Sequence, residues 1–163
     1  MRIKTFGLLL LVILAGCTNT TSTEKSITTS VSGEMLFSGP NSLQASVSTT
    51  ANELADELGI EAADLSSIDI SAIKISLAGE QAEIAESLLL QIVSNNNEMT
   101  ALGTLSPIEG GTSFDLNVAE EINLLPFMKD EGATWVLDVN LSEDIMDEMQ
   151  ATVDLTLDIN YKN

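Results

Sequence analysis

The sequence predicts an all-β fold, an antiparallel β-sandwich of about eight strands with one short capping helix, which follows a signal peptide and a flexible tether. From residue 31 onward, apolar side chains recur at every second position in short segments. Turn-forming residues separate these segments, and a single helix signal covers residues 50–59. An apolar period of two is typical of strands that bury one face.

The first 16 residues have the three-part plan of a secretory signal peptide. Arg2 and Lys4 provide a basic start, residues 6–14 are apolar apart from one glycine, and Ala15 and Gly16 are small. The apolar run is shorter than the roughly 20 residues that a membrane-spanning helix needs. We therefore expect residues 1–16 to be removed after export.

The residues Leu14-Ala15-Gly16-Cys17 resemble the lipobox of bacterial lipoproteins, and Cys17 is the only cysteine in the chain. In that family the chain is cut before the cysteine, here between Gly16 and Cys17. The cysteine sulfur then carries a diacylglyceryl group, and the new amine is usually acylated. A thiolate is a strong nucleophile, and two lipid chains hold a protein stably on a bilayer where one is marginal. The resemblance implies lipidation at Cys17 and a membrane partner through that lipid.

Residues 17–30 are expected to form a flexible tether behind this anchor. They are rich in Thr and Ser, and Ile27 is their one large apolar side chain. A random coil of this length reaches roughly 20 Å, which would lift a small domain off the bilayer. In lipoproteins of two-membrane bacteria, Asp after the cysteine favours retention at the inner membrane. Because this chain has Thr18 there, the resemblance favours the outer membrane or the cell surface.

The third part, residues 31–163, is the predicted sandwich domain and resembles small lipoproteins with immunoglobulin-like sandwiches. Within residues 68–77 the apolar phase changes, so that either a bulge lies near Ala72 or the strand begins at about Ser71; we favour the later start. The last two strands are expected to pair, because ten residues connect them. Turn residues such as SGPNS and NNN separate the predicted strands, which cover residues 31–37, 43–49, 68–77, 86–94, 98–105, 114–118, 135–141 and 152–161.

Two further segments are expected to cover an end of the sandwich. Thr50 and Glu53 have the capping-box spacing of a helix start, and Gly59 provides the stop. The favoured interpretation is a lid, and the alternative is a helix that binds a partner. Residues 122–128, INLLPFM, are expected to plug the end of the sandwich, with an exposed docking patch as the alternative.

Charge and composition restrict the function. The chain has 6 basic and 25 acidic residues, a formal net charge of −19. Such a polyanion is repelled by phosphate backbones and anionic headgroups, so no nucleic-acid partner is expected. The chain has no histidine, so it has no Ser-His-Asp triad and lacks the commonest transition-metal ligand. We predict no catalytic residues, no cofactor and no metal site.

Acidic side chains leave two alternatives open. Asp138 and Asp154 could act as paired carboxylates in glycoside cleavage, but among so many acids such a pair is expected by chance. Residues 138–144 have side chains with oxygen atoms at alternate positions, as in the first half of an EF-hand calcium loop. The glycine that such a loop has at its sixth position is missing. A calcium site in the following loop remains an alternative, less favoured than a solvated acidic loop. Its ligands would be Glu143, Asp144, Asp147 and Glu148.

These observations favour a non-catalytic binding or scaffolding domain that is lipid-anchored in the bacterial cell envelope, with another envelope protein as the expected kind of partner. The alternative is a carrier that holds a small apolar ligand between the sheets. A carrier needs an enclosed apolar cavity of about 300 Å³ or more, whereas a scaffold is packed solid. This difference can be examined in the structure.

Overall fold

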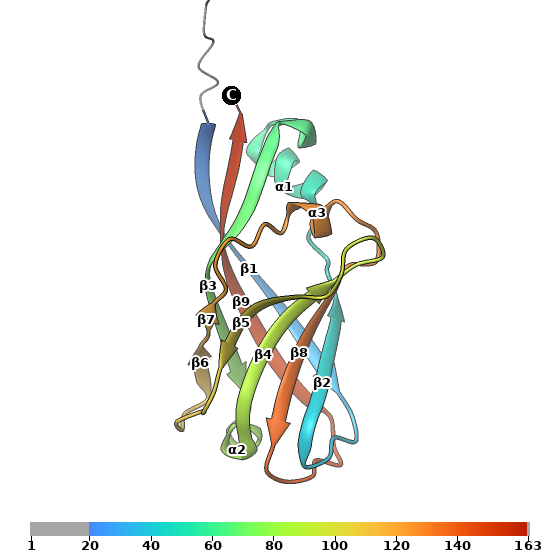
Figure 1. The fold of residues 1–163 in the computed structure, drawn as a ribbon, viewed down its shortest axis with the longest axis vertical. Helices are drawn as coiled ribbons and strands as arrows, with labels where there is room; N and C mark the ends of the chain where they lie inside the picture. The colour runs from blue at the N-terminus through green and yellow to red at the C-terminus, as the bar shows by residue number, and fades with distance from the viewer. Residues whose placement is uncertain (1–19, 163) are drawn as a thin grey trace, which may run out of the picture.

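The computed structural model describes residues 20–162, which form a predominantly antiparallel β structure (Figure 1). The strands of the described chain contain many more residues than its helices, which confirms the all-β prediction. In chain order the elements are β1 (Thr20–Gly33), β2 (Gly39–Ser46), α1 (Ala51–Leu58), the 3-10 helix η1 (Ala62–Asp64), β3 (Leu65–Leu77), α2 (Gly79–Ile84), β4 (Ala85–Val93), β5 (Thr100–Leu105), β6 (Ser113–Asp115), β7 (Asn117–Val118), α3 (Leu125–Met128), β8 (Thr134–Leu141) and β9 (Met149–Lys162).

The nine strands of the described chain form one sheet in the order β6-β3-β9-β1-β2-β8-β4-β5-β7. Strands β1 and β2 share only the register pair of Ser32 with Gln44, so the sheet folds over there and its two halves face each other across the core. The fold is therefore sandwich-like, although the two halves are continuous. A sheet that rolls in this way buries one face of every strand.

The two outer edges of the sheet nearly meet, because β6 pairs with β3 while β7, two residues later, pairs with β5. Between them the backbone N–H of Leu116 donates to the carbonyl of Ile73 (3.0 Å). Gly103 in β5 permits this close approach, since a Cβ there would lie 2.8 Å from Ile73 Cδ1. The sheet is thus nearly closed on itself, and short edges remain.

The prediction of a flexible tether is wrong for residues 20–30, which are the first part of β1. All fourteen residues of β1 pair with β9, from Thr20 opposite Lys162 to Gly33 opposite Met149. Threonine is β-branched, and it suits a strand whose outer face is exposed. A Thr- and Ser-rich segment with few large apolar side chains is typical of disorder, but this one pairs with β9, whose inward side chains are large and apolar. The folded domain therefore includes residues 20–30, which precede its predicted start at residue 31.

The predicted pairing of the last two strands is also wrong. Strand β9 lies between β1 and β3, and β8 lies between β2 and β4. Strand lengths give the reason: β9 has 14 residues and pairs with strands of 14 and 13, whereas β8 has 8 residues and pairs with strands of 8 and 9. The connection from β8 to β9 therefore crosses from one half of the sheet to the other.

Strand β3 contains the bulge that was the less favoured alternative. It begins at Leu65 rather than at Ser71, and its register with β9 shifts between Ile70 and Ala72. The extra residue reverses the facing of the strand. As a result, Ile68 before the bulge and Ile73 after it are both buried.

The helix signals agree with the structure. Thr50 Oγ1 accepts a hydrogen bond from the N–H of Glu53 (3.2 Å), and Glu53 Oε2 accepts one from the N–H of Thr50 (2.8 Å). Gly59 ends the helix at a φ of 68°. Helix α1 buries Leu54, and the short helix α3 buries Phe127, both toward the same end of the sheet (Figure 1).

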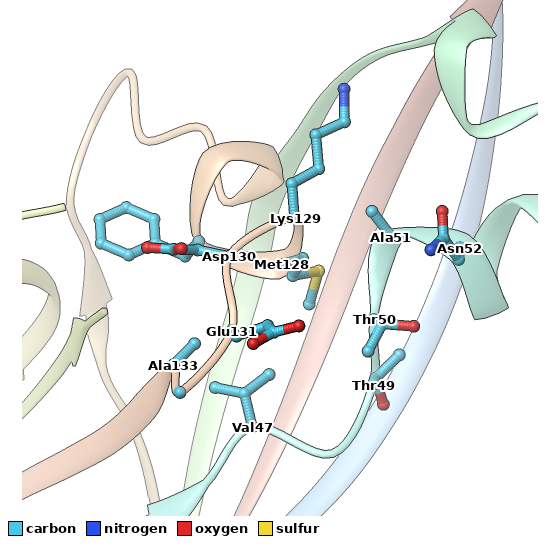
Figure 2. Close-up of a pocket in the computed structure, with 12 residues that line it drawn as sticks. Val47, Thr49, Thr50, Ala51, Asn52, Met128, Lys129, Asp130, Glu131 and Ala133 are labelled. Carbon is cyan, nitrogen blue, oxygen red and sulfur yellow. The ribbon is translucent and has the colours of Figure 1, made fainter. Parts of the chain in front are cut away.

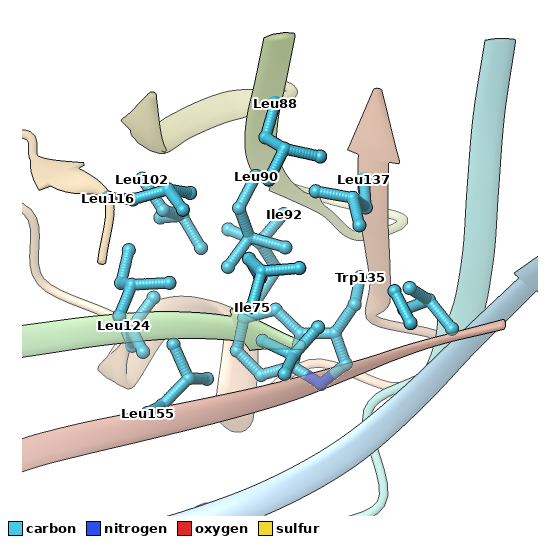
Figure 3. Close-up of a cluster of buried hydrophobic side chains, with 14 of the residues drawn as sticks. Ile75, Leu88, Leu90, Ile92, Leu102, Leu116, Leu124, Trp135, Leu137 and Leu155 are labelled. Carbon is cyan, nitrogen blue, oxygen red and sulfur yellow. The ribbon is translucent and has the colours of Figure 1, made fainter. Parts of the chain in front are cut away.

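One apolar core fills the space between the facing halves. Figure 3 shows Leu88, Leu90, Leu137, Trp135 and Leu155 among the side chains that occupy this space. In residues 20–162 no polar or charged side chain is buried in this core. The inward residues of β9 are the central part of it: Val153, Leu155, Leu157 and Ile159 are each at most 1% exposed.

Truncation of β9 should therefore be costly. We expect Leu155→Ala and Leu157→Ala each to lower the free energy of unfolding by about 2 to 5 kcal/mol, because each leaves a cavity in a packed core. Denaturant unfolding measures this change. The control is Thr156→Ala, whose side chain lies on the opposite face of the strand. Losses below about 0.5 kcal/mol at both leucines would contradict the assigned core.

Candidate functional site

The predicted lipidation site, Cys17, and the predicted cleavage site between Gly16 and Cys17 lie outside the described residues. The structure does describe where the chain enters the domain. Thr20 is three residues after Cys17, and three extended residues span about 10 Å. Thr20 and Lys162 pair at the end of the sheet near α1, which we call the anchor end (Figure 1).

Toward the anchor end lies a hollow of about 400 Å³ between the start of α1 and residues 127–133. Figure 2 shows Thr50 and Ala51 on one wall and Lys129 to Ala133 on the other. Glu131 lies toward the hollow, whereas Asp130 points away from it. The hollow opens to solvent, and its walls bring together one lysine, one aspartate and one glutamate. This arrangement is an open hollow with polar and apolar walls rather than an enclosed apolar site.

Asp130 is the acceptor at the centre of a polar cluster that joins the turn between β4 and β5 to the loop before β8. Its carboxylate accepts hydrogen bonds from Ser94 Oγ (2.6 Å), the N–H of Asn96 (2.8 Å) and Asn97 Nδ2 (3.4 Å). Asn95 Nδ2 adds a bond to the carbonyl of Glu131 (3.0 Å). The bond from Ser94, followed by that from Asn96, lowers the pKa of Asp130 below its usual value of 3.8.

A carboxyl group whose pKa is lowered is an ionised acceptor and a poor proton donor. The cluster therefore has a structural role, which is to hold two loops together next to the hollow. In the sequence, the three asparagines at residues 95–97 indicate a break between two strands but not this role. Asparagine commonly bonds to nearby backbone groups in turns, and a run of three is the signal that could have indicated it.

The structure does not bring Asp138 and Asp154 together as a carboxylate pair. They lie on β8 and β9, which β1 and β2 separate in the sheet. Asp138 accepts a hydrogen bond from the hydroxyl of Ser42, and Asp154 accepts one from the hydroxyl of Thr28. Each carboxylate is thus paired with a hydroxyl on a neighbouring strand.

The loop proposed for calcium, residues 142–148, connects β8 to β9. Asp144 in this loop accepts a hydrogen bond from the N–H of Ser38 (2.7 Å), which fixes the loop to the turn between β1 and β2. Within residues 20–162, no group of three or more His, Cys, Asp or Glu side chains gathers closely enough to hold a metal ion. The acids of this loop are exposed.

The interior bears on the carrier alternative. Large apolar side chains occupy the space between the halves, among them Trp135, Leu90 and Ile75 (Figure 3). Four surface hollows of about 320 to 490 Å³ are lined by strand ends, loops and helices rather than by the middle of the core. This dense packing differs from the enclosed apolar cavity that a carrier would need.

No protein-family model matches the chain, and no curated protein matches it. A solved structure titled "turnip yellow mosaic virus" is similar at 12% sequence identity and a TM-score of 0.24, over 86% of this chain and 96% of that one. A similarity at that TM-score carries no argument about fold or function. In the described part of the chain, no helix combines the length and the apolar character needed to cross a bilayer.

The Asp130 cluster predicts a pH-dependent contribution to stability. Because its folded-state pKa is lowered, its bonds stabilise the fold above about pH 4, and this contribution is lost as the pH falls through the folded-state pKa. We expect Asp130→Asn to lower the melting temperature at pH 7 but to have a smaller effect at pH 3. Thermal unfolding at both pH values measures this difference. Glu131→Gln is the control, and an equal loss at both pH values would contradict the interpretation.

Proposed function

We propose that this protein is a lipid-anchored protein of the bacterial cell envelope whose β domain binds or scaffolds other molecules without catalysis. The observation that carries the proposal is the lipobox-like Leu14-Ala15-Gly16-Cys17, which ends only three residues before the folded domain. A lipid on Cys17 would hold the domain directly at the bilayer. Thr18 after the cysteine favours the outer membrane or the cell surface over the inner membrane.

The packing of the described core supports binding at the surface. Large apolar side chains fill that core, whereas a carrier of an apolar ligand requires an enclosed cavity. An exposed surface is therefore the part of the molecule best suited to function.

The anchor is tested by Cys17→Ser. We expect the parent chain to incorporate a radioactive fatty acid in cells and to fractionate with membranes, because the sulfur and the new amine carry the lipid. The variant should be unlabelled, and it should either remain an uncleaved precursor or leave the membrane fraction. A variant that is labelled and fractionates like the parent would refute the lipoprotein assignment.

The short link also predicts an orientation on the membrane. Strand β9 spans roughly 40 Å, so Lys162 should lie near the bilayer and Glu143 should lie far from it. With Cys17 lipidated, Lys162→Cys and Glu143→Cys each provide one free thiol for a fluorophore. We expect energy transfer to a membrane dye to be much stronger from position 162.

The matched control inserts twelve Gly and Ser residues between Asn19 and Thr20. This insertion makes the link flexible and should reduce the difference between the two positions. Equal energy transfer from both positions of the parent chain would contradict the proposed orientation.

A further inference from the structure

The end of the sheet opposite the anchor end is formed by the β1–β2 turn, residues 34–38, and the β8–β9 loop, residues 142–148 (Figure 1). Two hydrogen bonds join these segments: the N–H of Leu36 donates to the carbonyl of Ile145 (2.9 Å), and the N–H of Ile145 donates to the carbonyl of Leu36 (2.8 Å). The side chain of Leu36 is buried and belongs to the apolar core. The two segments therefore form one ordered surface.

The residues next to this bridge are apolar and exposed. Met35 is 65% exposed, Phe37 is 60% exposed and Met146 is 67% exposed, and we call these three residues the distal patch. Met99 is the other large hydrophobic residue that is exposed in the described chain, and it lies between β4 and β5. Single exposed apolar side chains are ordinary, but a cluster of them marks an interaction surface.

Folding does not account for the distal patch. Its side chains are mostly in solvent, so they add little to the core. Met35 has a φ of 52°, in the left-handed region that side chains other than Gly, Asn and Asp rarely adopt. Neither burial nor backbone preference explains a methionine at this position, whereas contact with a partner would.

The charges around the distal patch indicate what kind of partner fits. The two segments contain no Lys or Arg. A hollow of about 320 Å³ between α2 and the β8–β9 loop places acidic side chains beside Ile84, Ile145 and Met146. The acids of this hollow are Glu80, Glu143, Asp144 and Asp147, and further exposed acids of the two segments are Glu34 and Glu148.

We propose that the distal patch docks a segment of another protein in which apolar side chains are flanked by Lys or Arg. The apolar side chains would cover Met35, Phe37 and Met146, and the cations would meet the surrounding carboxylates. A second copy of this chain would present the same negative charge, and anionic lipid would be repelled. The inference rests on the proposed binding function and names its surface and the chemistry of its partner.

The test measures binding of a synthetic ten-residue peptide of alternating Leu and Lys. The protein is the chain from residue 17 with Cys17→Ser, which retains every described residue and needs no detergent. A peptide of alternating Ser and Lys has the same charge, and one of Leu and Glu has the opposite charge. We expect the Leu/Lys peptide to bind at least tenfold more tightly than either control peptide, with an affinity that falls as salt is raised.

Variants separate apolar docking from diffuse attraction. M35S, F37S and M146S together keep every charge, and we expect them to weaken Leu/Lys binding at least tenfold. Met99→Ser is the matched control and should leave the affinity unchanged. Glu143→Gln with Asp147→Asn should reduce the salt dependence; Asp144 is left intact because it holds the N–H of Ser38. Unchanged melting temperatures verify that the variants are folded.

Four results would overturn the proposal. Equal affinity for the Leu/Lys and Ser/Lys peptides would mean that diffuse charge alone explains the binding. An unaffected triple variant would mean that the distal patch is not where the peptide docks. If the parent chain associates with itself and the triple variant does not, the distal patch docks a second copy of this chain. If the parent chain binds neutral lipid vesicles and the triple variant does not, the distal patch docks a bilayer. Fatty-acid labelling is independent of these results, so a failed anchor and a failed docking surface are distinguishable.

Discussion

The pairing of β1 with β9 is the interaction on which the rest of the structure depends. It joins the first and last described strands along fourteen residue pairs, and it gives β9 a neighbour on the side opposite β3. Because β1 and β2 share a single register pair, the chain can fold over there and bring the two halves face to face. The inward side chains of β9 then complete the core, with Leu157 fully buried. A strand inside a sheet has backbone N–H and C=O groups along both edges, so it needs a paired strand on each side.

This pairing also sets the geometry of the proposed function. Since β1 starts at Thr20, the position suggested for the lipid lies within a short extended span of the folded domain. The same strand ends at Gly33, next to the turn that carries Met35 and Phe37. One strand thus connects the anchor end to the distal patch, and the length of the sheet would separate the proposed lipid anchor from the proposed docking surface.

The polar features of the two ends differ in kind. Near the anchor end, the carboxylate of Asp130 is satisfied by Ser94 and by the asparagine turn, which ties two loops together. At the opposite end, Asp144 fixes the β8–β9 loop, while neighbouring acids such as Glu143 and Asp147 face solvent. Satisfied groups stabilise a fold, whereas exposed charge beside exposed apolar surface is available to a partner.

By itself, the sequence determined the elements that local chemistry controls. Period-two alternation located most strands, and the capping box of Thr50 and Glu53 located α1, because both depend on neighbours within a few residues. Only the tertiary structure decided which strands pair, that residues 20–30 form a strand, and that the bulge reverses β3. These outcomes depend on partners far along the chain, since the Thr-rich residues 20–30 pair with β9 at the other end of the sequence. The distal patch has the same origin: Met35 and Met146 are distant in sequence, and only the bridge between Leu36 and Ile145 places them on one surface.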